Sequence, residues 1–205
     1  MTLMSSKCKT CSIPDISLRV SADSLNSFTT LLQSGFFVSI TQGESIGGLL
    51  ASLPGFSEEY IKSRVQTIFM DGLPADNLKQ QFSTTETVLA ISAAMPGLAG
   101  AIFRKDGIHA SLRTATAKES CPIADDQKLS VRLKLFNIIA IERGAAILAQ
   151  GCLMQSISLQ KFLDYRPPLD AAIQKINING KETERKTLRQ ILETNNRIVI
   201  NIKSP

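Results

Sequence analysis

The sequence is poor in the residues that most often build nucleic-acid sites. Among its 205 residues there is no tryptophan and there are only two tyrosines, while the 23 Lys and Arg residues that give a formal net charge of +5 are spread along the chain. Proteins that bind single-stranded nucleic acid usually combine a concentrated basic patch with aromatic side chains on which bases stack. We therefore expect no nucleic acid among the partners.

Long hydrophobic runs are also missing. Runs such as residues 88–91 and 138–141 fall far short of the roughly 20 apolar residues that a membrane-spanning helix needs. The first residues carry early charge without the apolar stretch and small-residue cleavage site of a secretory signal. These features predict a protein that does not enter a membrane and acts in the cytoplasm.

Motifs for catalysis or cofactor binding are absent as well. His109 is the only histidine and no G-x-S-x-G sequence supplies a nucleophile for it, while residues 43–48 lack the Lys and Ser or Thr that end a phosphate-binding loop. We predict no catalytic residues and no cofactor. Cys8 and Cys11 have the spacing of half a zinc site or of a redox pair, and the alternative is that they are two unrelated thiols in a tail.

What the sequence does contain is an internal repeat. Residues 16–20 alternate as a half-buried strand does, and the same alternation returns at residues 129–133. Four further pairs of segments follow in the same order: 31–37 with 147–153, 45–50 with 158–163, 68–72 with 176–180, and 87–91 with 197–200. One order at a nearly constant offset indicates a tandem duplication of a small domain, because the period is too long for a solenoid repeat.

The repeat divides the chain into four parts. Residues 1–14 are expected to form a flexible tail, residues 15–113 a first domain, residues 114–128 a linker rich in Thr, Ser, Asp and Lys, and residues 129–205 a second domain. Residues 101–113 have apolar flanks around Lys105, Asp106 and Gly107. We predict an extra C-terminal β-hairpin there, attached to the first domain.

The order of strands and helices in each copy, strand, helix, strand, helix, strand, turn and strand, is that of the β-grasp or ubiquitin-like fold. Residues 131–136, followed by a helix that ends at residues 142–144, resemble the opening of the molybdopterin synthase small subunit and of the thiamine-pathway sulfur carriers. Residues 176–180 and 192–200 resemble the later strand, turn and final strand of that family. The resemblance implies an α+β protein with two β-grasp-like domains in tandem.

One departure from the family limits what the resemblance implies about chemistry. Its sulfur carriers work through a free C-terminal Gly-Gly, which is adenylated and converted to a thiocarboxylate, whereas this sequence ends at Pro205. In the first copy Met95, Pro96, Gly97 and Gly100 stand where the glycine tail would be, but the chain continues. Sulfur-carrier chemistry is therefore not expected.

Residues 93–101 are nevertheless the most unusual stretch, because bulky side chains are almost absent from them. Such a stretch permits close approach of its backbone to a neighbouring domain, to a partner or to a ligand. The first hypothesis is a non-catalytic protein-binding or scaffold protein, with a protein partner and with a homodimer left open. The alternative is an enzyme or small-ligand-binding protein that uses an interdomain cleft near residues 93–101, with Met95, Pro96, Gly97 and Gly100 as contacts.

Overall fold

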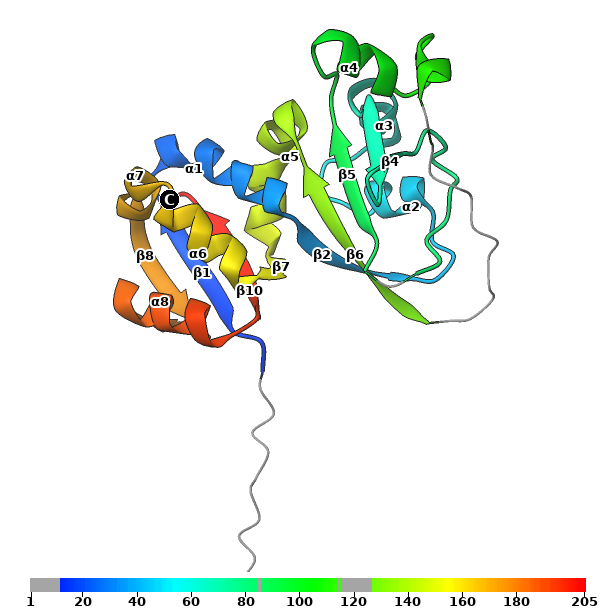
Figure 1. The fold of residues 1–205 in the computed structure, drawn as a ribbon. Helices are drawn as coiled ribbons and strands as arrows, with labels where there is room; N and C mark the ends of the chain where they lie inside the picture. Colours follow the sequence, from blue (N-terminus) through cyan, green and yellow to red (C-terminus); the bar gives the residue numbers. More distant parts are fainter. Residues whose placement is uncertain (1–11, 85, 114, 116–126) are drawn as a thin grey trace, which may run out of the picture.

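The computed structural model describes residues 12–84, 86–113, 115 and 127–205 and contains one mixed sheet packed with helices (Figure 1). The strands are β1 (Asp15–Val20), β2 (Phe36–Thr41), β3 (Thr67–Met70), β4 (Leu73–Pro74), β5 (Val88–Ser92), β6 (Lys128–Leu135), β7 (Cys152–Gln155), β8 (Ile173–Ile178), β9 (Lys181–Glu182) and β10 (Arg197–Lys203). The α-helices are α1 (Ala22–Phe28), α2 (Ile46–Ala51), α3 (Glu58–Arg64), α4 (Gly97–Phe103), α5 (Asn137–Gln150), α6 (Ser156–Asp164), α7 (Pro167–Ala171) and α8 (Arg185–Thr194), with short 3-10 helices η1 (Thr29–Ser34) and η2 (Ala110–Leu112). The expected α+β class is confirmed.

The ten strands are ordered β4-β3-β5-β6-β2-β7-β10-β1-β8-β9. β6 lies between β2 and β5, and β1 lies between β8 and β10. The first strand of each sequence copy therefore completes the sheet of the other copy. The two parts of the sheet meet where β2 and β7 pair at Phe37 and Leu153, so strand pairing crosses the boundary expected at residues 114–128.

Equivalent turns occur at matching places in the two copies. Asp71 and Gly72 follow β3 with φ values of 50° and 82°, and Asn179 and Gly180 follow β8 with 50° and 78°. Two successive residues with positive φ form the tight turn that suits the twist of a hairpin, which is why Asp-Gly and Asn-Gly stand there. The turns after β3 and β8 thus have the same backbone form.

The core lies on one face of each part of the sheet. On β6 the buried residues Leu129, Val131, Leu133 and Leu135 alternate with half-buried polar ones, because successive side chains of a strand point to opposite faces. Helices α2 and α3 cover that buried face. The opposite face, which carries Arg132 and Lys134, is called the open face below.

Helix α5 joins the two parts of the molecule. The Tyr60 hydroxyl of α3 donates a hydrogen bond of 2.7 Å to Glu142 of α5, Arg64 forms an ion pair with the same carboxylate, and the Arg143 guanidinium lies 3.9 Å from the Tyr60 ring centre. Burial, together with the bond to Glu142, raises the pKa of Tyr60 to about 12. Hydrogen bonds from Arg64 and Tyr60 hold the pKa of Glu142 below its ordinary value.

The same helix passes very close to η1. A Cβ placed on Gly144 of α5 would lie 2.6 Å from Cβ and 2.9 Å from Cγ2 of Thr29, and 3.2 Å from Leu32. Atoms of a protein interior pack as closely as those of an organic crystal. Glycine is therefore required at this crossing because any side chain would push η1 away.

The expected hairpin at residues 101–113 is wrong. Residues 97–103 form helix α4, residues 110–112 form η2, and only a turn at Asp106, with φ of 54°, corresponds to the predicted Lys105–Gly107 turn. Alanines in this stretch favour a helix, and residues 101–113 do not pair with any described strand. Within the described part of the chain, no helix is both long and apolar enough to cross a bilayer.

Candidate binding site

The segment with few bulky residues leads from β5 into α4. Pro96 is the residue before the first turn of α4, and Gly97 begins the helix with φ of 73°, a conformation that favours glycine. A Cβ on Gly97 would meet no atom within 4 Å. The need for glycine here comes from the backbone turn rather than from a packed neighbour.

Gly100 has a different reason for lacking a side chain. A Cβ at this position would lie 1.7 Å from the carbonyl oxygen of Met95, so the helix can close onto the preceding residues only because Gly100 is a glycine. The close approach permitted by this segment is thus made by its own backbone. Gly100 is buried, while Pro96 and Gly97 are exposed.

Beside this segment a hollow of about 420 Å³ opens on the open face. Side chains from three neighbouring strands line it, together with Met95 and the start of α5. Its lining residues, hereafter the apolar hollow, are Phe69, Gly72, Val88, Ala90, Ile91, Ser92, Met95, Lys134, Phe136 and Asn137. Of the four residues that the sequence singled out, Met95 lines the hollow and Pro96, Gly97 and Gly100 do not.

Strand register brings the walls of the hollow together. Phe69 of β3 stands opposite Ala90 of β5, and Ala90 stands opposite Lys134 of β6. Phe103 of α4 packs on Phe69 with ring centres 5.3 Å apart, and so α4 closes one side. The result is an apolar floor with one cation at its border.

Polar groups stand at the end of the hollow nearest α5. Asn137 begins that helix with φ of 54°, and its side-chain amide donates a 2.9 Å hydrogen bond to the Ser92 hydroxyl. The Lys134 ammonium makes no hydrogen bond or ion pair with any residue that the structure describes. It is therefore available to an anionic group.

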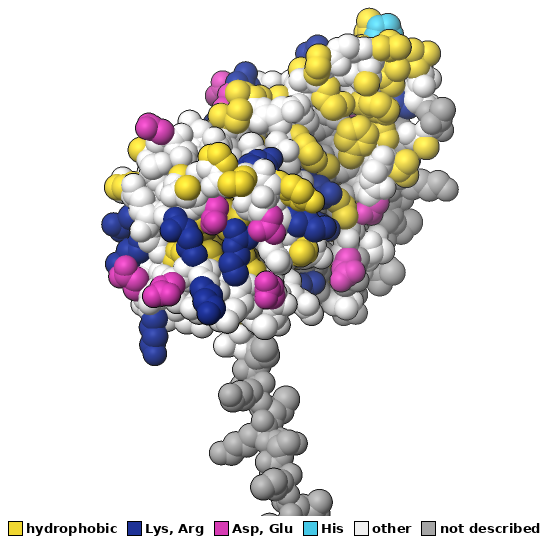
Figure 2. Space-filling model, turned by 60° about the vertical axis from the view of Figure 1, so that its left-hand side comes forward, with side chains coloured by type: hydrophobic (Ala, Val, Ile, Leu, Met, Phe, Trp, Pro, Cys, Tyr) yellow, Lys and Arg dark blue, Asp and Glu magenta, His cyan; other side chains and the backbone are white. Residues whose placement is uncertain are grey.

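Apolar side chains stand exposed on α4 and on the residues that follow it. Leu98 of α4 is 71% exposed, Ile108 in the turn after it is 91% exposed and Leu112 of η2 is 60% exposed. Figure 2 shows hydrophobic side chains gathered around His109, the one histidine, with Lys and Arg side chains below them. Large apolar side chains exposed together are typical of interaction surfaces.

The α4–η2 unit is held to the sheet by hydrogen bonds. The Arg113 side chain, only 3% exposed, donates to the carbonyl oxygens of Ile102 and Arg104 and to Asp76 at 2.7 Å. The Lys105 amide donates to the Gln66 carbonyl at 2.6 Å. The exposed apolar residues thus sit on a fixed support.

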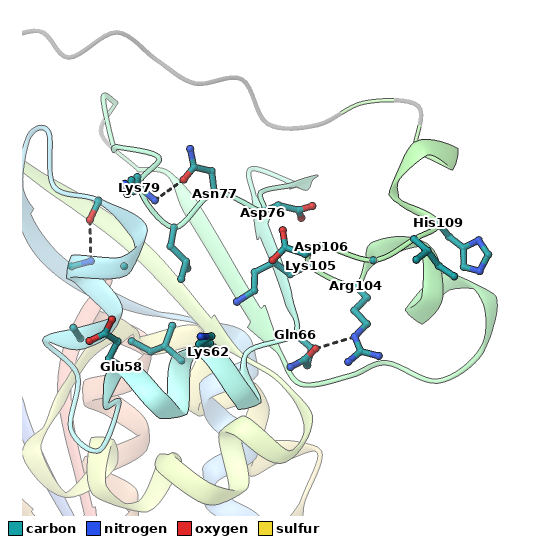
Figure 3. Close-up of a pocket in the computed structure, with 18 of the residues that line it drawn as sticks. Glu58, Lys62, Gln66, Asp76, Asn77, Lys79, Arg104, Lys105, Asp106 and His109 are labelled. Carbon is teal, nitrogen blue, oxygen red and sulfur yellow. Dashed lines mark hydrogen bonds between the residues drawn. The ribbon is translucent and has the colours of Figure 1, made fainter.

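A larger and more open groove of about 1490 Å³ lies on the other side of the α4–η2 unit, toward α2 and α3 (Figure 3). Its side chains carry both signs of charge without a common focus. Arg104 is bonded to Gln66 at 3.0 Å, and the backbone of Lys79 to Asn77 at 2.9 Å. His109 lies at the rim with its ring pointing away from the other labelled residues. This arrangement does not assemble an acid, a base and a nucleophile around one point.

The cysteines for which the sequence suggests metal or thiol chemistry are not brought together among the described residues. Cys8 and Cys11 lie outside the described residues. Cys152 is buried in β7, and burial raises the pKa of its thiol to about 12. Among the described residues, no group of three or more His, Cys, Asp or Glu side chains could hold a metal ion.

Sequence reasoning did not identify most of the hollow. Phe69, Val88, Ala90, Lys134 and Phe136 belong to separate strand segments, and each looks ordinary in its own stretch. The available signal was alternation: Phe69 and Ala90 directly follow the buried residues Ile68 and Leu89, and so must point to the opposite face. Comparison with protein-family models, with curated proteins and with solved structures finds no match for this chain.

Proposed function

We propose that this chain is a non-catalytic protein-binding or scaffold protein that receives an apolar side chain of a partner in the apolar hollow. The observation that carries the proposal is the apolar hollow itself, which is lined mainly by apolar side chains and is closed on one side by α4, whose Leu98 is exposed. Binding energy at protein interfaces is concentrated where a buried apolar group fills a pocket. The surrounding exposed residues would then exclude water from that contact.

The scaffold that we propose is built from two similar units. Two β-grasp-like units, related to sulfur carriers but without their chemistry, would present sheet faces and edges to partners, in the cytoplasm. The matched turns at Asp71–Gly72 and Asn179–Gly180 and the pairing of a parallel central strand pair in each part of the sheet, β5 with β6 and β1 with β10, support a duplicated unit. A homodimer through the same hollow remains among the partners that an experiment can reveal.

A second candidate function rests on the same hollow. Its volume of about 420 Å³ falls in the range of roughly 300–1,000 Å³ typical of small-molecule sites. Lys134, Asn137 and Ser92 would supply the few polar groups that orient such a ligand. This candidate predicts an amphipathic anionic molecule rather than a protein in the hollow.

Peptide display distinguishes the two functions. A library of short random peptides is selected on the whole protein and on an Ala90→Arg variant, which fills the hollow. Ser39→Arg is the matched control, because Ser39 is an exposed residue of the same sheet that does not line the hollow. Circular dichroism checks that both variants fold.

We expect peptides with apolar residues that bind the wild type and Ser39→Arg but not Ala90→Arg. Peptides that bind all three proteins equally, or an empty pool, would remove the basis of the proposal. In a parallel arm, small anionic amphiphiles are tested for thermal stabilisation of the same three proteins. Stabilisation that Ala90→Arg abolishes, without any selected peptide, would favour the ligand-binding candidate.

A further inference from the structure

A second depression of about 620 Å³ adjoins the apolar hollow. It runs between η1, β6 and the α6 helix, and we call it the basic groove. The two depressions share Lys134 and Phe136. They therefore form one continuous surface from the α4 side of the open face to α6.

The charges of the basic groove have one sign. Arg132, Lys134, Lys161 and Arg166 line it, and the described residues that line it include no carboxylate. Four cations close together repel one another unless anions neutralise them. The side chains of Lys134, Lys161 and Arg166 make no hydrogen bond or ion pair with other described residues, so their charges are not neutralised within this part of the chain.

Each of the two arginines of the groove makes one contact within the protein. The Arg166 guanidinium lies 4.6 Å from the centre of the Phe162 ring, an arrangement that leaves its edge free to donate two parallel hydrogen bonds to a carboxylate. Arg132 donates one bond of 2.6 Å to the Ser34 carbonyl, while its Nε is buried and has no partner. A guanidinium group held in this way favours a carboxylate, whose two oxygens can accept its two parallel hydrogen bonds.

We propose that the apolar hollow and the basic groove together bind an acidic segment of a partner protein, in extended conformation, with an apolar residue in the hollow and carboxylates in the groove. This inference rests on the proposed function and names the chemistry of the partner. In an extended segment every second side chain points to the same side, so that an apolar residue and acidic residues two or four positions away can reach the two depressions from one strand of peptide.

A nucleic acid fits these observations less well. Four cations offer few contacts for a phosphate backbone, whose binding depends on the number of phosphates neutralised. Aromatic side chains do line the two depressions, Phe69 and Phe136 in the hollow and Tyr165 in the groove, so an oligonucleotide is included in the test as a direct competitor. A peptide with an apolar side chain uses both depressions.

The test uses the complete chain and peptides selected on it from the random library. The selected peptides are synthesised with fluorescent labels, and each is paired with a version in which Gln replaces every Asp and Glu. Binding is measured by fluorescence anisotropy to the wild type, to Lys161→Glu/Arg166→Glu and to the control Lys181→Glu. Lys181 is an exposed residue of the outermost strand β9. Labelled oligothymidylate is measured in parallel.

We expect enrichment of Asp and Glu two or four positions from an apolar residue, and affinity about tenfold or more weaker for the Gln peptides and for the double variant but not for Lys181→Glu. Peptides that occupy the hollow yet show no acidic enrichment and no loss with the double variant would overturn this inference while leaving the proposed function intact. Oligothymidylate that binds more tightly than the peptides would also overturn it. An empty pool would count against both proposals.

Discussion

Replacing Gly144 by alanine tests the close crossing of α5 and η1. In an exposed helix this change would stabilise the protein by about 1 kcal/mol, because glycine is the poorer helix former. At this crossing the new Cβ would lie 2.6 Å from Cβ of Thr29, whereas carbon atoms prefer about 3.5–4.0 Å. Thr29 Cβ is attached to the backbone and cannot rotate away, so we take the upper part of the usual overpacking cost, about 3 kcal/mol.

The net expectation is that the free energy of unfolding falls by about 2 kcal/mol. With a slope of about 2 kcal/mol per molar of urea, the unfolding midpoint falls by about 1 M. Far-ultraviolet circular dichroism during urea unfolding measures it. Ala146→Gly, at an exposed position of the same helix, is the matched control and should lower the midpoint by only about 0.5 M.

A midpoint for Gly144→Ala that is unchanged or higher than that of the wild type would refute the packing argument. A double-mutant cycle sharpens the result. Thr29→Gly removes both close atoms, and the double variant should therefore be less destabilised than the sum of the single variants by about 1–2 kcal/mol. If the free-energy changes of the two single variants add up to that of the double variant, residues 29 and 144 are not in contact.

Three further predictions concern ionisable groups. The variant Tyr165→Phe leaves Tyr60 as the remaining tyrosine, and its phenolate absorbance should rise with a midpoint near pH 12. Adding Glu142→Gln should move this midpoint to a lower pH, because the carboxylate that raises the pKa of Tyr60 is gone. A midpoint at pH 10 in Tyr165→Phe alone would contradict the burial of Tyr60. The pKa of Glu142 is lowered in the folded protein, so its contribution to stability is present above the ordinary carboxyl pKa and is lost as the pH falls through the folded pKa. The difference in urea unfolding midpoint between the wild type and Glu142→Gln should therefore shrink in acid. A difference that does not depend on pH would contradict this prediction. In a variant with the other three cysteines replaced by serine, Cys152 should react with a thiol reagent only after unfolding, because its thiol is buried and has a pKa of about 12. Rapid labelling of the folded protein would contradict the burial of Cys152.

Local features of the fold could be predicted from the sequence because their causes are local. The alternation at residues 16–20 and the Asp71–Gly72 turn each predict the structure that is found, since side-chain direction and positive φ depend on adjacent residues. Strand partners could not be predicted in this way. Alternation tells which face of β1 is buried, but Ile16 and Leu18 would be equally buried beside strands of either copy.

The site illustrates the same limit. Met95 attracted notice because its neighbours are small, whereas Ala90 and Lys134 become neighbours only through the register of β5 and β6. The wrong hairpin arose from a correct turn signal at Asp106 whose flanking residues form the helices α4 and η2. A turn signal predicts a local backbone conformation, but it does not decide whether the flanking residues become strands or helices.

The exchanged first strands have a consequence for the way this protein is made. Among the described strands β1 is synthesised first, yet its two neighbours are β8 and β10, and β10 is synthesised after the others. During synthesis β1 therefore cannot form its native pairs until residues 173–203 have emerged. Unpaired strand edges are the usual starting points of aggregation. We therefore expect the risk of aggregation to be greater during synthesis than in the folded molecule.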